Sequence, residues 1–193
     1  MKKLGLLLIL IIFIHVPSIG QFKVGYYYKK DGTKVAGMLR FNYGGNALTE
    51  KSDGDCSVSY KTDKGGKKVK LTTNDICCFV IEKDSFAIIK NFRLNAFVSY
   101  PQDFAKVIAS GKINLYLYYS TVQQGYAVST VTDWVIEKDG KADKLTRKRF
   151  RELLPTYLND YPKLLNQIEN DQLNYNDAEK IIKMYNEYME NNG

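Results

Sequence analysis

Histidine is nearly missing from this sequence. The one histidine, His15, lies in an N-terminal segment that we expect to be removed. A mature chain without histidine cannot form a Ser-His-Asp triad, a Cys-His nucleophile pair or a histidine-containing zinc site. Acid–base chemistry would fall to Asp, Glu, Lys or Tyr, but the 21 carboxylates offer no pair that stands out from solvated surface groups. We therefore assign no catalytic residue and expect no cofactor.

Cysteine is scarce as well, with only Cys56, Cys77 and Cys78. No Cys-x-x-Cys spacing or second ligand cluster accompanies them, so the pattern favours neither a metal site nor a redox site. In a regular strand Cys77 and Cys78 would point to opposite faces, so only one of them could meet Cys56. Two outcomes stay open, a disulfide between Cys56 and Cys78 or three unpaired thiols that serve as small core residues.

Long apolar runs are missing after the N-terminus. Two lysines followed by the apolar stretch Leu4 to Ile14, 11 residues long, and small residues before Gln21 predict a cleaved signal peptide over residues 1–20. The stretch is shorter than the roughly 17–25 residues of a membrane-spanning helix, although an uncleaved anchor is the alternative. We expect a periplasmic or secreted protein with no transmembrane segment after cleavage.

Charge is unevenly distributed along the chain. Residues 21–150 carry 22 basic and 13 acidic residues, and residues 151–193 carry 4 and 8. The basic part could attract an acidic partner such as a membrane surface or a polyanion. Its lysines are scattered over predicted turns, which favours docking of the two parts or simple solubility instead. The export signal argues against nucleic acid as a partner.

Alternating strand-like runs separated by turn residues fill the first two thirds of the chain. Asp31-Gly32 and Asp139-Gly140 are typical hairpin turns. The runs around them are rich in Tyr, Val, Ile, Phe and Thr, as expected of strands. Only residues 103–110 fit a short helix as well as a strand.

The apolar period changes near residue 145. Phe150, Leu153, Leu154, Tyr157 and Leu158 have helical spacing, although Pro155 should kink or shorten that helix. Pro162 marks a second start, and Asn176 with Glu179 predicts the cap of a third helix. The sequence therefore predicts an α+β fold, with a mostly antiparallel β-hairpin body over residues 21–145. About three short helices over residues 146–193 would pack on that body.

Tyrosine is abundant, with 15 residues. Alternation places Tyr26 with Tyr28 on one strand face, and Tyr116 with Tyr118 on another. If these faces are exposed, the four tyrosines could bind a sugar or an extended peptide, because each offers a large rigid ring and a hydroxyl. The alternative is that they cover the sheet or form cross-strand pairs.

Four segments, "GYYYKKDGTKVAGMLRF", "GKINLYLYY", "YLNDYPKLLNQI" and "KIIKMYNEY", are similar to exported Bacteroidota proteins of unknown function. The resemblance implies a hairpin-rich domain with C-terminal helices, and it implies no catalytic residues. In some members a similar segment precedes an outer-membrane barrel. This sequence departs from that pattern, since no barrel follows its helices, and we therefore do not expect a role as a barrel's periplasmic partner.

These observations lead to one main functional hypothesis and one alternative. The main hypothesis is an exported, non-enzymatic binding or interaction module of the Gram-negative cell envelope, with a protein or glycan partner. The alternative is a carboxylate-dependent hydrolase that acts on a polymeric substrate. It would require a buried pair of carboxyls about 5–10 Å apart in a cleft, as in glycosidases.

Overall fold

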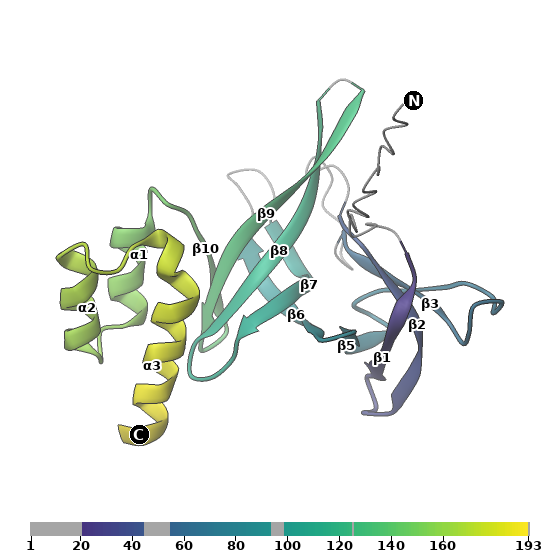
Figure 1. The fold of residues 1–193 in the computed structure, drawn as a ribbon, viewed down its shortest axis with the longest axis horizontal. Coiled ribbons are helices and arrows are strands. Elements are labelled where there is room, and N and C mark those ends of the chain that lie inside the picture. The colour runs from purple at the N-terminus through teal and green to yellow at the C-terminus, as the bar shows by residue number, and fades with distance from the viewer. Residues whose placement is uncertain (1–20, 45–54, 94–98, 125, 193) are drawn as a thin grey trace, which may run out of the picture.

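The computed structural model describes residues 21–44, 55–93, 99–124 and 126–192. The expected signal peptide, residues 1–20, lies outside the described residues. Within the described part, ten strands form one antiparallel sheet and three α-helices follow at the C-terminal end (Figure 1). This confirms the prediction of a mostly β structure with C-terminal helices. The elements are β1 Lys23–Lys29, β2 Lys34–Asn42, β3 Ser57–Lys61, β4 Val69–Leu71, β5 Ile76–Ile81, β6 Asp84–Arg93, β7 Ser99–Ala109, β8 Asn114–Gln124, β9 Ala127–Lys138, β10 Lys141–Leu145, α1 Phe150–Tyr157, α2 Pro162–Glu169, the 3₁₀ helix η1 Tyr175–Asp177 and α3 Ala178–Asn192.

Turn chemistry explains why the chain folds into consecutive hairpins. Gly32 and Gly140 have φ angles of 83° and 80°, which glycine adopts at no steric cost. Asp31 Oδ1 accepts a hydrogen bond of 2.8 Å from the backbone N–H of Thr33, which closes the β1–β2 turn. Residues 103–110 also fitted a short helix, but residues 103–109 instead belong to β7.

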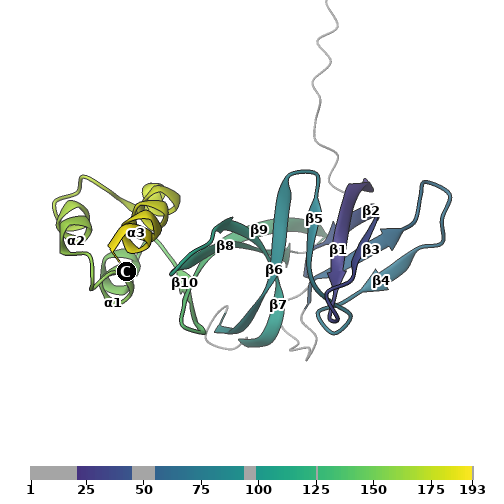
Figure 2. The same ribbon diagram turned by 90° about the horizontal axis from the view of Figure 1, so that it is seen from below.

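The order of strands across the sheet is β10-β9-β8-β7-β6-β5-β1-β2-β3-β4. Neighbours in the sheet are also neighbours in sequence, except at β1 and β5, where the chain returns to pair beside its first strand. The sheet also curls, so that β10 lies against β6, and Figure 2 looks along this curl. Strong right-handed twist is the usual cause of such curvature in long antiparallel sheets.

The curl divides the buried apolar side chains into two clusters. The first cluster lies within the sheet and includes Phe79, Phe104 and Tyr118. The second lies between the helices and the end of the sheet formed by β7 to β10, and includes Leu115, Ile136 and Leu154. One strand can serve both clusters because successive side chains point to opposite faces.

The helices largely follow the predicted starts. Helix α1 continues past Pro155, and α2 has Pro162 at its first position, where a missing N–H is tolerated. The predicted cap at Asn176 was wrong by two residues, because Asn174 caps the 3₁₀ turn η1 and forms a capping box with Asp177. No helix among the described residues is long and apolar enough to span a membrane.

Candidate functional site

Two of the four predicted binding tyrosines lie in the interior. Tyr118 has 0% and Tyr116 has 8% of its surface exposed. Burial raises the pKa of Tyr116 to about 12, and burial raises the pKa of Tyr118 well above its usual range. The alternation of the strand was predicted correctly, but the curl of the sheet turns this face inward. Neither side chain can serve as an exposed contact surface.

The other two predicted tyrosines lie together on β1. Tyr26 and Tyr28 are half-buried, and their rings meet edge to face with centroids 5.7 Å apart. The Lys34 ammonium lies 3.7 Å from the centre of the Tyr26 ring, a cation–π contact. The structure therefore separates the four predicted tyrosines into two pairs. Tyr116 and Tyr118 are interior, whereas Tyr26 and Tyr28 lie at the surface, where the Lys34 ammonium already covers the Tyr26 ring.

A buried carboxylate organises the interior next to Tyr118. Asp103 has 0% of its surface exposed. Its Oδ2 accepts hydrogen bonds from the Tyr118 hydroxyl at 2.8 Å and the Asp55 N–H at 3.0 Å. Its Oδ1 accepts from the N–H groups of Cys56 at 3.0 Å and Phe104 at 2.8 Å. Burial raises the pKa of Asp103, and these hydrogen bonds oppose that shift.

This network bears on the hydrolase alternative. Asp55 lies beside Asp103 and accepts a hydrogen bond of 2.7 Å from the Tyr100 hydroxyl. The pair is thus close, but the oxygens of Asp103 already accept from four protein donors and the residue is inaccessible to solvent. The hydrogen bonds of the Asp103 carboxylate connect β7 with the segment before β3. Because it is enclosed, this carboxylate is poorly placed to receive a proton from a substrate.

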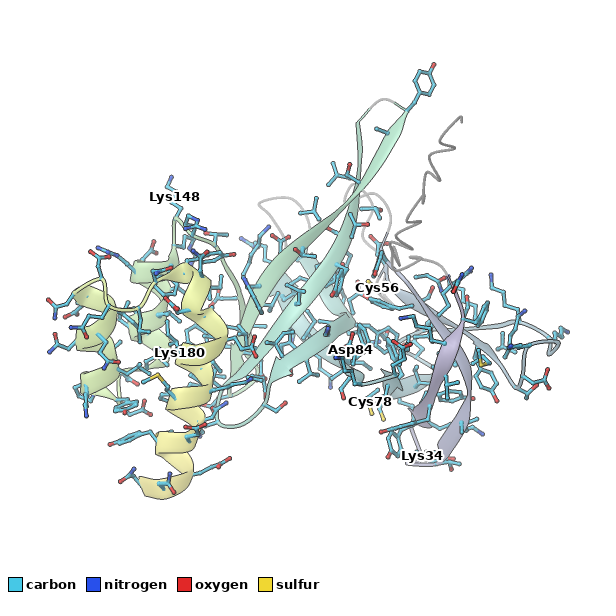
Figure 3. The ribbon with its side chains drawn as sticks, in the orientation of Figure 1. Lys34, Cys56, Cys78, Asp84, Lys148 and Lys180 are labelled. Carbon is cyan, nitrogen blue, oxygen red and sulfur yellow. The ribbon has the colours of Figure 1, made fainter. Side chains whose placement is uncertain are left out.

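The three cysteines are free. Cys56 has 1% of its surface exposed, and its Sγ lies 3.6 Å from the backbone oxygen of Tyr119. Figure 3 shows Cys78 in a different part of the sheet from Cys56. The structure thus contains no Cys56–Cys78 disulfide.

The expectation that Cys77 and Cys78 point apart was wrong. Their Sγ atoms lie 3.5 Å from each other. The cause is a register shift between β1 and β5, where Tyr28 pairs with Cys78 but Lys29 pairs with Ile76. Such a β-bulge sets two residues against one and redirects a side chain. The simple alternation rule cannot anticipate it.

A surface feature that the sequence reasoning missed is the far half of the β8–β9 hairpin. Among the described residues, the pairing of β8 with β7 ends at Leu117, and the pairing of β9 with β10 ends at Trp134. Beyond these points the two strands pair with each other as far as Gln124 and Ala127. We call residues 121–132 the arm, and Figure 1 shows it extending past the rest of the sheet.

The arm contacts the rest of the described chain at its base. Gly44 forms an isolated bridge with Ser120, and the Thr121 N–H donates to the Gly44 carbonyl oxygen at 2.9 Å. Beyond this bridge, Val122 has 38% and Tyr126 has 108% of its surface exposed. Val131, which pairs with Ser120 at the bridge itself, has 39% exposed.

The arm carries no charge. No Asp, Glu, Lys or Arg lies between Lys112 and Asp133, although 25% of all residues are charged. Natural sheets usually protect their edges with lysine, proline or short strands. This gap in charge is the sequence signal that could have revealed the arm, because it is long for a sequence in which a quarter of the residues are charged.

Two surface hollows flank α3. One is lined by Asn176, Glu179, Lys180, Lys183 and Glu187 among others, and the second lies between α3 and the end of β7. Charges of both signs line the first hollow, and Lys183 pairs with Glu179 at 2.6 Å. Neither hollow thus presents a field of one sign. In the part of the chain that the structure describes, no group of three or more His, Cys, Asp or Glu could hold a metal.

Comparisons of the chain with protein families, with curated proteins and with solved structures found no match.

Proposed function

We propose that the protein is an exported, non-enzymatic interaction module of the Gram-negative cell envelope, with the arm as its contact surface. The export part rests on the N-terminal signal pattern, and the resemblance to exported Bacteroidota proteins supports the same location. The observation that carries the interaction part is the uncharged, solvent-exposed two-stranded arm. An isolated two-stranded ribbon is at best marginally stable in water. A partner that completes its hydrogen bonding would stabilise it.

The partner that fits the arm best is a protein that offers an uncharged extended segment. An open strand edge presents backbone N–H and C=O groups, which bind an added strand by main-chain hydrogen bonds. The β-branched residues Val122 and Val131 suit packing on a pleated surface, and Tyr126 at the tip adds a large rigid contact area. The lack of charge gives the arm no means of attracting a polyanion.

The hydrolase alternative has less support. It needs carboxyls that reach a substrate, whereas Asp103 is enclosed by protein donors. A glycan partner also has less support, because Tyr116 and Tyr118 are interior and Tyr26 already contacts Lys34.

The test is a pair of identical substitutions at two exposed valines. Val131→Lys places a charge on the arm, and Val24→Lys places one on β1, where the valine is 71% exposed. Capture of envelope proteins by immobilised Val131→Lys protein should fall about tenfold or more, since an unpaired desolvated charge would cost at least ~1.4 kcal/mol. Capture by Val24→Lys protein should stay at the level of the unmodified protein.

Two results would contradict the proposal. Equal capture by the two variants would exclude the arm as the contact surface. Self-association of the purified protein, seen by light scattering and lost only in Val131→Lys, would assign the arm to a second copy of this chain instead of an envelope partner.

A further inference from the structure

The bulge in β5 brings two adjacent thiols together on one surface. Cys77 is the extra residue of the bulge, since Tyr28 and Lys29 pair with Cys78 and Ile76. Its Sγ lies 3.5 Å from the Tyr28 carbonyl oxygen and 3.5 Å from the Sγ of Cys78. Bulges often redirect a side chain, and they are common next to functional sites.

The two thiols are also accessible and separate from the third cysteine. Both Cys77 and Cys78 are half-buried, and neither is enclosed by the core. Cys56 is enclosed beside Tyr119 and Asp103. Within the described residues, each thiol of the pair therefore has the other as its nearest disulfide partner.

We propose that Cys77 and Cys78 form a reversible redox pair, which a low-molecular-weight disulfide oxidises to a vicinal disulfide. One thiolate attacks a sulfur of the oxidant, forming a mixed disulfide and releasing the first thiol. The neighbouring thiolate then attacks the protein sulfur of the mixed disulfide and releases the second thiol. In total two protein thiols lose two protons and two electrons, and one small disulfide becomes two small thiols.

Geometry accounts for both the closing and the reopening of the bond. The sulfurs lie 3.5 Å apart and must approach to about 2.05 Å for the bond to form. Adjacent Cα atoms are about 3.8 Å apart, below the usual range of about 4.4–6.8 Å for disulfides. The closed ring is therefore strained, and strained, exposed disulfides are the ones that thiols reduce readily.

Burial and the contact with the Cys77 thiol raise the pKa of Cys78 to about 11. Thiol–disulfide exchange proceeds through the thiolate, so closure should become faster as pH rises.

The experiment treats the folded protein with oxidised glutathione, blocks remaining thiols with an alkylating agent, and analyses tryptic peptides by mass spectrometry. Cys77 and Cys78 share the peptide Leu71–Lys83, whereas Cys56 falls in another. We expect the shared peptide to lose two hydrogen atoms and escape alkylation, and Cys56 to be alkylated after denaturation. Added dithiothreitol should restore both thiols of the pair.

Serine variants separate the steps. Cys78→Ser should stop at the glutathione adduct on Cys77, and Cys56→Ser should oxidise like the unmodified protein. Closure should be at least about tenfold faster in the folded protein than in urea, because the bulge holds the sulfurs together. Equal rates of disulfide closure in the folded protein and in urea would show that closure depends only on the adjacency of the two cysteines in the sequence, and this would overturn the proposal. Alkylation of both thiols after oxidation, or a peptide cross-linked to Cys56, would also overturn it.

Discussion

Asp103 is the residue on which the interior of the sheet is organised. It accepts hydrogen bonds from Asp55, Cys56, Phe104 and Tyr118, and so connects the segment before β3 with β7 and β8. A carboxylate with no exposed surface is costly unless it is bonded in this way. Asp103 therefore fixes a specific arrangement of these three segments at some cost in stability.

The raised pKa of Asp103 gives a pH dependence with a definite sign. The folded state holds the proton at higher pH than the unfolded state does, so this group reduces stability as pH rises from about 4 through its folded pKa. The free energy of unfolding of the unmodified protein, taken relative to that of Asp103→Asn protein, should therefore fall as pH rises. Urea unfolding of both proteins from about pH 4 to about pH 8 measures it, and a relative value that rises with pH would contradict the assignment.

Single residues also mark the limit of sequence reasoning. The alternation rule correctly grouped Tyr116 with Tyr118, because a strand's geometry is local. It could not tell that this face is interior, because that depends on a curl that brings β10 against β6. It failed at Cys77, because a bulge depends on the strand opposite, and Tyr28 is far away in sequence.

At the scale of elements, an asparagine side chain of α3 bonds the backbone next to β8 of the sheet, in addition to the apolar packing between helix and sheet. The Asn186 amide donates to the Ile113 carbonyl oxygen at 2.8 Å and accepts from the Ile113 N–H at 2.9 Å. A Cβ atom on Gly111 would lie 2.5 Å from Cγ of Asn186, so glycine is needed for this approach. Lys138 adds a second connection, to the Tyr185 hydroxyl of α3 at 2.9 Å.

Asn186→Ala should destabilise the protein by roughly 2–4 kcal/mol, because it leaves a buried N–H and a buried C=O without partners. Asn191→Ala is the matched control on the same helix, since its amide bonds an exposed carbonyl one turn earlier. It should change the unfolding free energy by less than about 0.5 kcal/mol. Denaturant unfolding of the two variants compares them, and equal losses would show that Asn186 is not the attachment point.

Elements themselves were the most predictable part of the fold. Turn pairs such as Asp31-Gly32 and helix starts such as Pro162 act within a few residues, so their signals are visible in the sequence. The arm escaped notice because its strands fit the hairpin pattern, and only the lack of pairing beyond Leu117 and Trp134 distinguishes it. Pairing between strands is not local, and no run of residues encodes it alone.

At the scale of the whole molecule, the helices and the arm have different surroundings. The helices lie at one end of the sheet, beyond β10, and the β1–β4 strands lie at the other, while the arm projects between them (Figures 1 and 2). The acidic C-terminal part meets the basic sheet where Lys138 approaches Asp160 at 3.4 Å. This ion pair is consistent with docking of the two parts, which the charge distribution allowed, and it involves no residue of the arm.

Site-specific cross-linking tests the interaction proposal most directly. A photoreactive amino acid replaces Tyr126 at the tip of the arm or, as the control, Val24 on β1, and the protein is irradiated in envelope extract. We expect a discrete cross-linked protein from position 126, lost when Val131→Lys is added, and no such product from position 24. Equal cross-linking from both positions, or a product from 126 that survives Val131→Lys, would contradict it.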